Sequence, residues 1–179
     1  AALLSVSALN VLRSETLPHC DFTDPGEVLT RLSDKFQTRS QSGKFFTVWY
    51  GVYRPSVREL AWSGGGHPPA ALIPSPGEED PLIELPSSGP MPGLMPDLGY
   101  ETQRLVVPEG ARLLLFSDGV YELHRSDGSL WTHGAFLATA REAARRKGVF
   151  LGEIVVRARE IREGSPFVDD VSLLTVDFP

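Results

Sequence analysis

The sequence predicts an α+β domain in which helices cover antiparallel sheet. Apolar residues recur at helical spacing over residues 1–13 and again after Asp24. A run of short apolar and β-branched segments follows, and helical spacing returns at 136–146 before one last strand. Strands that follow one another without intervening helices pair antiparallel, and the helices at both ends of the run must bury their apolar faces on the sheet.

The first two helices are indicated by apolar spacing and by capping residues. In the second helix, Asp24 suits the N-cap, Pro25 suits the first helical position, and Glu27 is placed to reach back as in a capping box. The two apolar stripes consist of Leu4, Ala8, Val11 and Leu12 in the first helix and Val28, Leu29, Leu32 and Phe36 in the second. Because the chain opens inside a helix and without a methionine, we expect the natural chain to continue upstream.

The strands are predicted from aromatic and β-branched runs that turn residues separate. Residues 45–53 are interpreted as a buried strand, which the Arg54-Pro55-Ser56 turn joins to the next strand as a hairpin. Strands are predicted at 45–53, 59–63, 70–73, 82–85, 101–107, 112–117 and 171–176, and further helices at 136–146 and 151–162. The acidic cluster Glu78-Glu79-Asp80 is interpreted as solvated surface in a loop.

Length and composition indicate one ordinary globular domain spanning residues 1–179, with 41% hydrophobic and 22% charged residues. The net charge of −6 argues against a nucleic-acid or anionic-membrane binder, because both need a positive field. No apolar run approaches the length of a bilayer span, so we predict no membrane insertion. The single cysteine, Cys20, excludes an intrachain disulfide and a cysteine-based zinc site, and it favours a cytoplasmic location.

Two acidic motifs form the candidate site. One apolar strand ends in Asp118, which Gly119 follows at once, and the pair Asp169-Asp170 opens another apolar strand. If the two strands are neighbours, their acidic ends meet at one edge of the core. Facing carboxylates repel each other unless they are protonated or bridged by a cation. Mg²⁺ and Mn²⁺ accept such oxygen ligands while they keep several waters.

Each motif alone has a second interpretation, and other residues carry weaker signals. Asp118-Gly119 is also typical of a hairpin turn, and Asp169-Asp170 is also typical of a solvated strand start. His67 has no second histidine at metal-ligand spacing, and the glycines at 64–66 lack the following helix of a phosphate-binding loop. Ser117 lies in no Gly-x-Ser-x-Gly elbow, which argues against a serine nucleophile.

Four sequence blocks, in order, resemble the protein phosphatase 2C (PPM) family, and in particular its bacterial branch that governs stress response and sporulation. The blocks are FFTVWYGVY at 45–53, SGGGHPPA at 63–70, LLFSDGVYE at 114–122 and DDVSLL at 169–174. The resemblance implies a layered β-sandwich flanked by α-helices, an α-β-β-α arrangement with a two-metal centre at one end. It makes Asp118 and Asp169 the ligands of Mn²⁺ or Mg²⁺, with Gly119 and Asp170 as close neighbours.

The resemblance also implies that the PPM-type domain in residues 1–179 is N-terminally truncated. The family's other metal residues lie upstream, in an acidic strand and in an Asp-x-x-Gly-His-Gly turn that directly precedes a helix like that at 1–13. The chain is therefore expected to lack the first strands and this upstream metal-binding turn. Weak metal binding and little activity are expected of these residues alone.

The activity that the resemblance implies is hydrolysis of phosphoserine or phosphothreonine on a regulatory protein by a metal-activated water. It further implies a phosphorylated anti-sigma-factor antagonist as substrate and a sensor or receiver domain upstream. The alternative is a non-catalytic or truncated phosphatase-like module that acts by protein–protein binding in a signalling pathway. The upstream Asp-x-x-Gly-His-Gly turn distinguishes the two, since an intact aspartate there favours catalysis.

Overall fold

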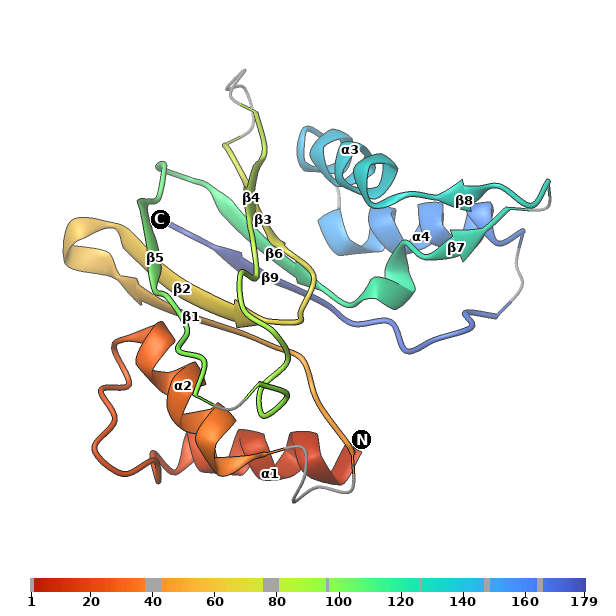
Figure 1. Cartoon of the computed structure of the whole chain (residues 1–179). Helices are drawn as coiled ribbons and strands as arrows, with labels where there is room; N and C mark the ends of the chain where they lie inside the picture. Colours follow the sequence, from red (N-terminus) through yellow and green to blue (C-terminus); the bar gives the residue numbers. More distant parts are fainter. Residues whose placement is uncertain are drawn as a thin grey trace. The chain divides into compact units, whose positions relative to one another are not determined.

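The structure of the chain is a computed structural model (Figure 1), in which two compact units are described separately. The first unit comprises residues 1–69 and 86–107, and the second comprises residues 70–85 and 108–179. The residues described are 2–37, 43–75, 81–95, 97–125, 127–146, 149–163 and 166–179. The acidic cluster predicted at 78–80 lies outside these ranges. The predicted α+β class with antiparallel sheets is confirmed.

The first unit combines two helices with a three-stranded antiparallel sheet of order β1-β2-β5. Its elements are α1 (Ala2–Arg13), α2 (Pro25–Lys35), β1 (Val48–Arg54), the 3-10 turn η2 (Pro55–Val57), β2 (Glu59–Gly65) and β5 (Gln103–Val106). The predicted hairpin is confirmed, since β1 and β2 pair on either side of η2. Helix α2 packs against both of these strands.

The second unit holds a four-stranded antiparallel sheet of order β4-β3-β6-β9 and a two-stranded hairpin. Its strands are β3 (Ala70–Ile73), β4 (Ile83–Leu85), β6 (Arg112–Phe116), β7 (Leu123–His124), β8 (Leu130–Trp131) and β9 (Leu173–Asp177). Its helices are α3 (His133–Ala144) and α4 (Phe150–Ile161), and a 3-10 turn, η3 (Asp118–Val120), follows β6. The two helices pack on each other, α3 against β3 and α4 against β9.

The start of α2 follows the predicted capping chemistry with one difference. The Asp24 carboxylate accepts hydrogen bonds from the amides of Gly26 (3.1 Å) and Glu27 (3.4 Å), and Pro25 occupies the first turn. The Glu27 carboxylate accepts from the Asp21 amide (3.3 Å) and does not close a capping box on Asp24, because the Asp24 amide already donates to the Asp21 carbonyl. The Asp21 carbonyl in the loop before the helix therefore accepts from the N-cap amide in place of the Glu27 carboxylate.

The largest departures from the predicted strands are one late start and one hairpin that was not predicted. The strand expected from residue 45 begins at Val48, and Phe45 is 51% exposed. Strand β1 is only partly covered because it lies at the edge of its sheet in the part of the chain that is described. The β7–β8 hairpin was not predicted, since strands of two residues are too short to show an alternating pattern.

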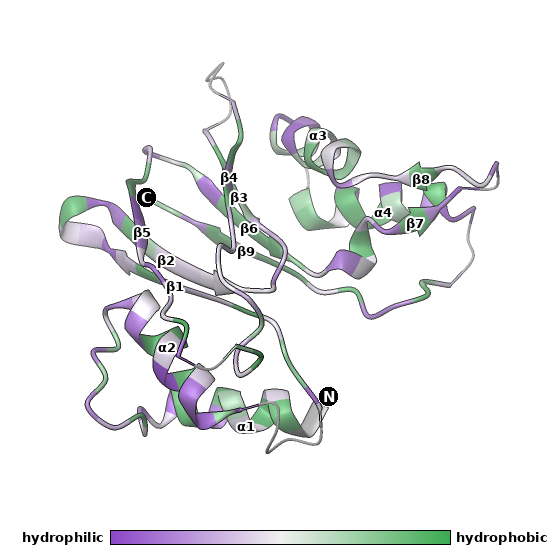
Figure 2. Cartoon of the chain, in the orientation of Figure 1, coloured by the Kyte–Doolittle hydropathy of each residue, from purple (hydrophilic) through white to green (hydrophobic). Residues whose placement is uncertain are grey.

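The core of the second unit surrounds β6. Most of this strand is coloured as hydrophobic in Figure 2. It lies between β3 and β9, and its residues Leu114 and Phe116 are almost fully buried. The ring of Phe116 packs against that of Phe136 on α3, with centroids 4.6 Å apart. This packing fixes the end of β6, where the candidate site begins.

None of the helices in the described ranges combines the length and apolar character that a membrane crossing requires.

Candidate functional site

Asp118 stands where the buried strand β6 leaves the core. The chain turns directly from Phe116 through Ser117 into η3, whose last residue, Val120, is fully buried and anchors the turn. The Asp118 carbonyl accepts from the amides of Tyr121 and Glu122 (both 3.0 Å), while its side chain is exposed. The interpretation of Asp118-Gly119 as a hairpin turn is therefore wrong, because these residues open a 3-10 turn that leads out of the sheet.

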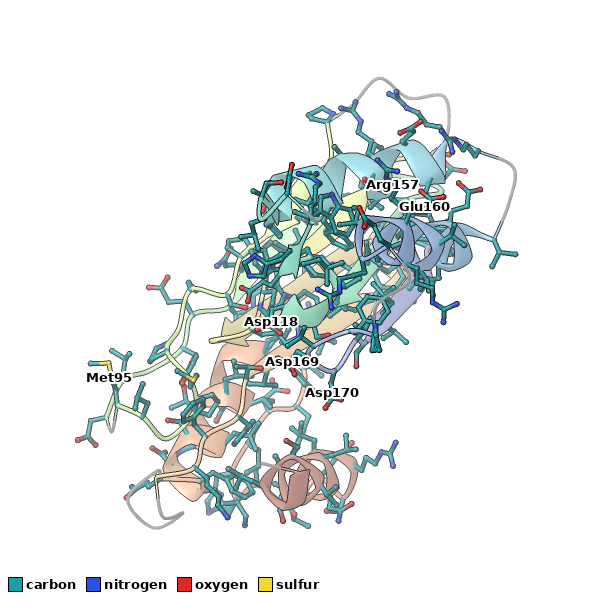
Figure 3. The ribbon with its side chains drawn as sticks, turned by 90° about the vertical axis from the view of Figure 1, so that its right-hand side faces the viewer. Met95, Asp118, Arg157, Glu160, Asp169 and Asp170 are labelled. Atoms are coloured by element: carbon teal, nitrogen blue, oxygen red, sulfur yellow. The ribbon has the colours of Figure 1, made fainter. Side chains whose placement is uncertain are left out.

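Strand β9 brings the second acidic motif to the same edge. β9 is the antiparallel neighbour of β6, with Phe116 opposite Leu173. The residues that precede β9 consequently run back alongside those that follow β6. Figure 3 shows Asp118, Asp169 and Asp170 near one another, and the contacts between the two segments confirm that they are adjacent.

Ser117 forms three hydrogen bonds that join the two segments. Its amide donates to the Ser172 carbonyl (3.0 Å), its hydroxyl donates to the Asp170 carbonyl (2.9 Å), and the Ser172 amide donates to its hydroxyl oxygen (2.9 Å). Sequence reasoning considered Ser117 only as a nucleophile and missed this role. The signal available was its position, a small hydroxyl residue between a buried strand and an acidic turn.

Gly119 is the point of closest approach between the segments. A Cβ atom built on it would lie 2.5 Å from the Asp170 carbonyl oxygen and 3.3 Å from the Asp169 carbonyl carbon. The first distance is one that real Cβ atoms essentially never show and the second is slightly tight, so glycine is what allows the backbones to come this close. The structure thus brings the backbones of Gly119 and Asp170 together.

The acidic side chains at this edge have no neutralising partner among the residues that the structure describes. The Asp118 carboxylate accepts from the Gly119 amide (3.0 Å), and the Asp169 carboxylate accepts from the Asp170 amide (2.7 Å). All three aspartates are exposed, and within the described ranges no basic side chain forms an ion pair with them. Each of the first two carboxylates therefore keeps one oxygen available, and their negative charges favour a cation.

The oxygen atoms at this edge match the chemistry of the divalent metal that the resemblance implies. The donors at this edge are carboxylate and carbonyl oxygens, which suit Mg²⁺ or Mn²⁺. Across the described residues, no group of three or more His, Cys, Asp or Glu side chains is arranged to hold a metal ion. Asp118 and Asp169 supply two carboxylates of the kind such an ion accepts, and further ligands would have to complete a metal centre.

The weaker candidates have structural roles. The His67 ring contacts the backbone of the next residue, with Nδ1 2.8 Å from the Pro68 carbonyl oxygen. The amide of Gly66 donates to the Gly89 carbonyl, and the Gly89 amide donates to the Gly64 carbonyl (both 3.0 Å), so the glycine run binds its own chain and forms no phosphate cradle. Burial, followed by the nearby Glu27 charge, raises the pKa of the Cys20 thiol, which disfavours a reactive thiolate.

Comparison with proteins of known sequence gives related phosphatases. Phosphoserine phosphatase RsbU of Bacillus subtilis (strain 168) is 24% identical over 106 residues, which cover 59% of this chain and 31% of RsbU. The chain thus spans about a third of the length of that relative. Among solved structures, the SiaA-PP2C domain of Pseudomonas aeruginosa matches 99% of this chain and 70% of that domain, with a TM-score of 0.79 at 19% identity. RsbX in complex with magnesium matches 98% of this chain and 73% of RsbX, with a TM-score of 0.62 at 16% identity.

These likenesses define the fold as that of a PP2C-type phosphatase domain, an α+β sandwich. The chain belongs to the family described as Stage II sporulation protein E (SpoIIE), whose model matches residues 1–179. The family predicted from the four sequence blocks is therefore confirmed. By family, the chain is a PP2C-like phosphatase domain related to RsbU and SpoIIE.

Proposed function

We propose that the full-length protein containing this chain removes phosphate from phosphoserine or phosphothreonine, with Asp118 and Asp169 holding Mn²⁺ or Mg²⁺. The observation that supports the proposal is the pair of exposed carboxylates where the end of β6 lies beside the start of β9, in a chain of the SpoIIE family. A divalent cation held there by Asp118 and Asp169 would supply Lewis-acid activation of water and would neutralise charge on the phosphoryl oxygens. RsbX, a structural relative, was solved with magnesium, which supports the choice of metal.

Asp118 and Asp169 act as ligands in this proposal and not as nucleophiles. One oxygen of each carboxylate accepts from the next backbone amide, which orients the side chain and leaves the second oxygen for the cation. Asp170 and Gly119 position the pair through backbone contact. Binding of a cation also relieves the repulsion between carboxylates that the fold holds at one edge.

The substrate that we propose is a phosphorylated anti-sigma-factor antagonist, and a sensor or receiver domain upstream would control the activity. Support comes from the family and from RsbU, whose name describes it as a phosphoserine phosphatase. Such a substrate would be met in the cytoplasm. The net charge of −6 leaves nucleic acid a poor partner, because phosphate groups need a positive surface.

The test is a matched pair of Asp→Asn changes in the full-length protein. Asp118→Asn removes the ligand charge and is expected to abolish Mn²⁺-dependent release of phosphate from a phosphoserine protein. Asp127→Asn is the control, since Asp127 is also exposed and its carboxylate also accepts from a nearby amide, that of Ser129 (2.8 Å). The control should keep wild-type activity.

Two results would contradict the proposal. Retained activity in Asp118→Asn would show that this carboxylate holds no essential metal. Wild-type protein that binds the phosphorylated antagonist but releases no phosphate at any Mn²⁺ concentration would instead favour the alternative function, a phosphatase-like module that acts by protein–protein binding.

A further inference from the structure

We infer that Ser117 is a positioning residue for the metal site, and that its hydroxyl sets the spacing between the Asp118 and Asp169 carboxylates. The inference rests on the proposed function, in which these two aspartates hold the cation. It assigns a role to a residue that lies between two acidic segments about 50 positions apart in the sequence.

The Ser117 hydroxyl uses both of its hydrogen-bonding capacities on the segment before β9. It donates its proton to the Asp170 carbonyl and accepts from the Ser172 amide, each at 2.9 Å. A donor and an acceptor that are held by one side-chain atom fix both the distance and the rotation of the backbone between them. Asp169 immediately precedes this fixed stretch, so its side chain inherits the orientation.

The position of the Asp170 carbonyl is defined from a second direction by Gly119. The same oxygen that accepts from Ser117 is the one that leaves no room for a Cβ on Gly119. The hydroxyl therefore draws this carbonyl toward the Asp118 turn, and backbone contact with Gly119 limits how far it moves. The two acidic turns are held together at a set distance, which is what two ligands of one metal centre require.

A nucleophilic role for Ser117 does not fit these contacts. Its proton is donated to a backbone carbonyl, and none of its hydrogen bonds within the described residues involves a histidine or a carboxylate that would act as a base. Ser117 is only partly buried, and the two residues that its hydroxyl bonds, Asp170 and Ser172, are exposed. Water is able to replace the hydroxyl when it is removed, so the fold should survive and the spacing should become looser.

The test compares Ser117→Ala, Ser117→Thr and Ser129→Ala in the full-length protein. The Mn²⁺ concentration for half-maximal hydrolysis of a phosphoserine protein should rise roughly tenfold in Ser117→Ala, by analogy with the loss of other groups that orient metal ligands. The maximal rate at saturating Mn²⁺ should remain within about twofold of wild type, because the ligands themselves are intact. This separation of metal affinity from maximal rate is not expected from general destabilisation.

The two other variants test the hydroxyl itself. Ser117→Thr keeps a hydroxyl at the same position and should restore the wild-type Mn²⁺ dependence. Ser129→Ala removes an exposed hydroxyl that bonds the side chains of Arg125 and Asp127, and it should also behave as wild type. A wild-type Mn²⁺ dependence in Ser117→Ala, or a shift of equal size in Ser129→Ala, would overturn the inference.

Hydrogen exchange of residues 166–172 in metal-free protein separates this inference from the proposed function. The Ser172 amide loses its acceptor in Ser117→Ala, so exchange there should be faster than in wild type. If wild-type protein shows no Mn²⁺-dependent hydrolysis, the proposed function fails, and the exchange result still decides whether Ser117 positions the segment. Unchanged exchange would overturn the positioning role even in an active enzyme.

Discussion

Replacing Gly119 by alanine tests directly whether the two acidic segments depend on close backbone contact. The added Cβ would lie 2.5 Å from the Asp170 carbonyl oxygen, whereas ordinary contact begins at 3.4 Å. One of the segments must therefore move by about 0.9 Å, the difference between these distances. The oxygen belongs to backbone and not to the flexible end of a side chain, so the contact cannot be relieved by a change of rotamer.

The expected loss of stability follows from three contributions. Forcing an extra methyl group into a packed position costs about 1–3 kcal/mol. A displacement of this size is sufficient to break the 2.9 Å hydrogen bond from Ser117 to Asp170, which contributes about 0.5–1.5 kcal/mol. Alanine recovers about 0.4–1 kcal/mol by restricting the unfolded chain. The net destabilisation should be about 2 kcal/mol, and the Mn²⁺ needed for activity should rise.

Urea unfolding followed by circular dichroism measures this change against a matched control. Gly134→Ala makes the same substitution in the first turn of α3, where nothing lies within 4 Å of the added Cβ. It should leave stability unchanged or raise it by up to about 1 kcal/mol, because alanine favours helix. A Gly119→Ala protein as stable as wild type, with the same Mn²⁺ dependence, would refute the requirement for close contact.

Two further predictions concern packing and pH. Phe136→Ala should destabilise the protein by about 3–5 kcal/mol in urea unfolding, because Phe136 is fully buried against Phe116 and Trp131; a loss below about 1 kcal/mol would contradict this packing. The hydrogen bond from Thr102, opposed by burial and aided by the Glu27 and Gly26 amides, lowers the pKa of Asp24 below its ordinary 3.8. Its stabilisation is therefore present above that value and is lost as the pH falls through the lowered pKa. Asp24→Asn should have a lower urea midpoint than wild type at about pH 6, and the difference between the two midpoints should become smaller toward about pH 2. A difference in midpoint that does not change with pH would contradict the role of the charge.

Much of the local structure was predictable because its causes lie within a few residues. The start of α2 depends on Asp24 and Pro25, and the end of β6 depends on an apolar run that stops at a carboxylate. Such signals involve neighbours three or four positions apart, so they can be recognised directly from the local sequence pattern. The exposure of Phe45 was not predictable in this way, because it depends on which strands flank β1 and not on the aromatic run itself.

The amino-acid sequence by itself determined the family, the α+β class and the candidate pair Asp118 and Asp169, since these depend on ordered blocks and local patterns. Only the tertiary structure decided that β6 and β9 are neighbours, that Asp118 opens a 3-10 turn, and that Ser117 and Gly119 hold the two motifs together. The physical reason is sequence distance. A hydrogen bond and a backbone contact between residues about 50 positions apart leave no local pattern, because each residue is compatible with many partners until the sheet register selects one.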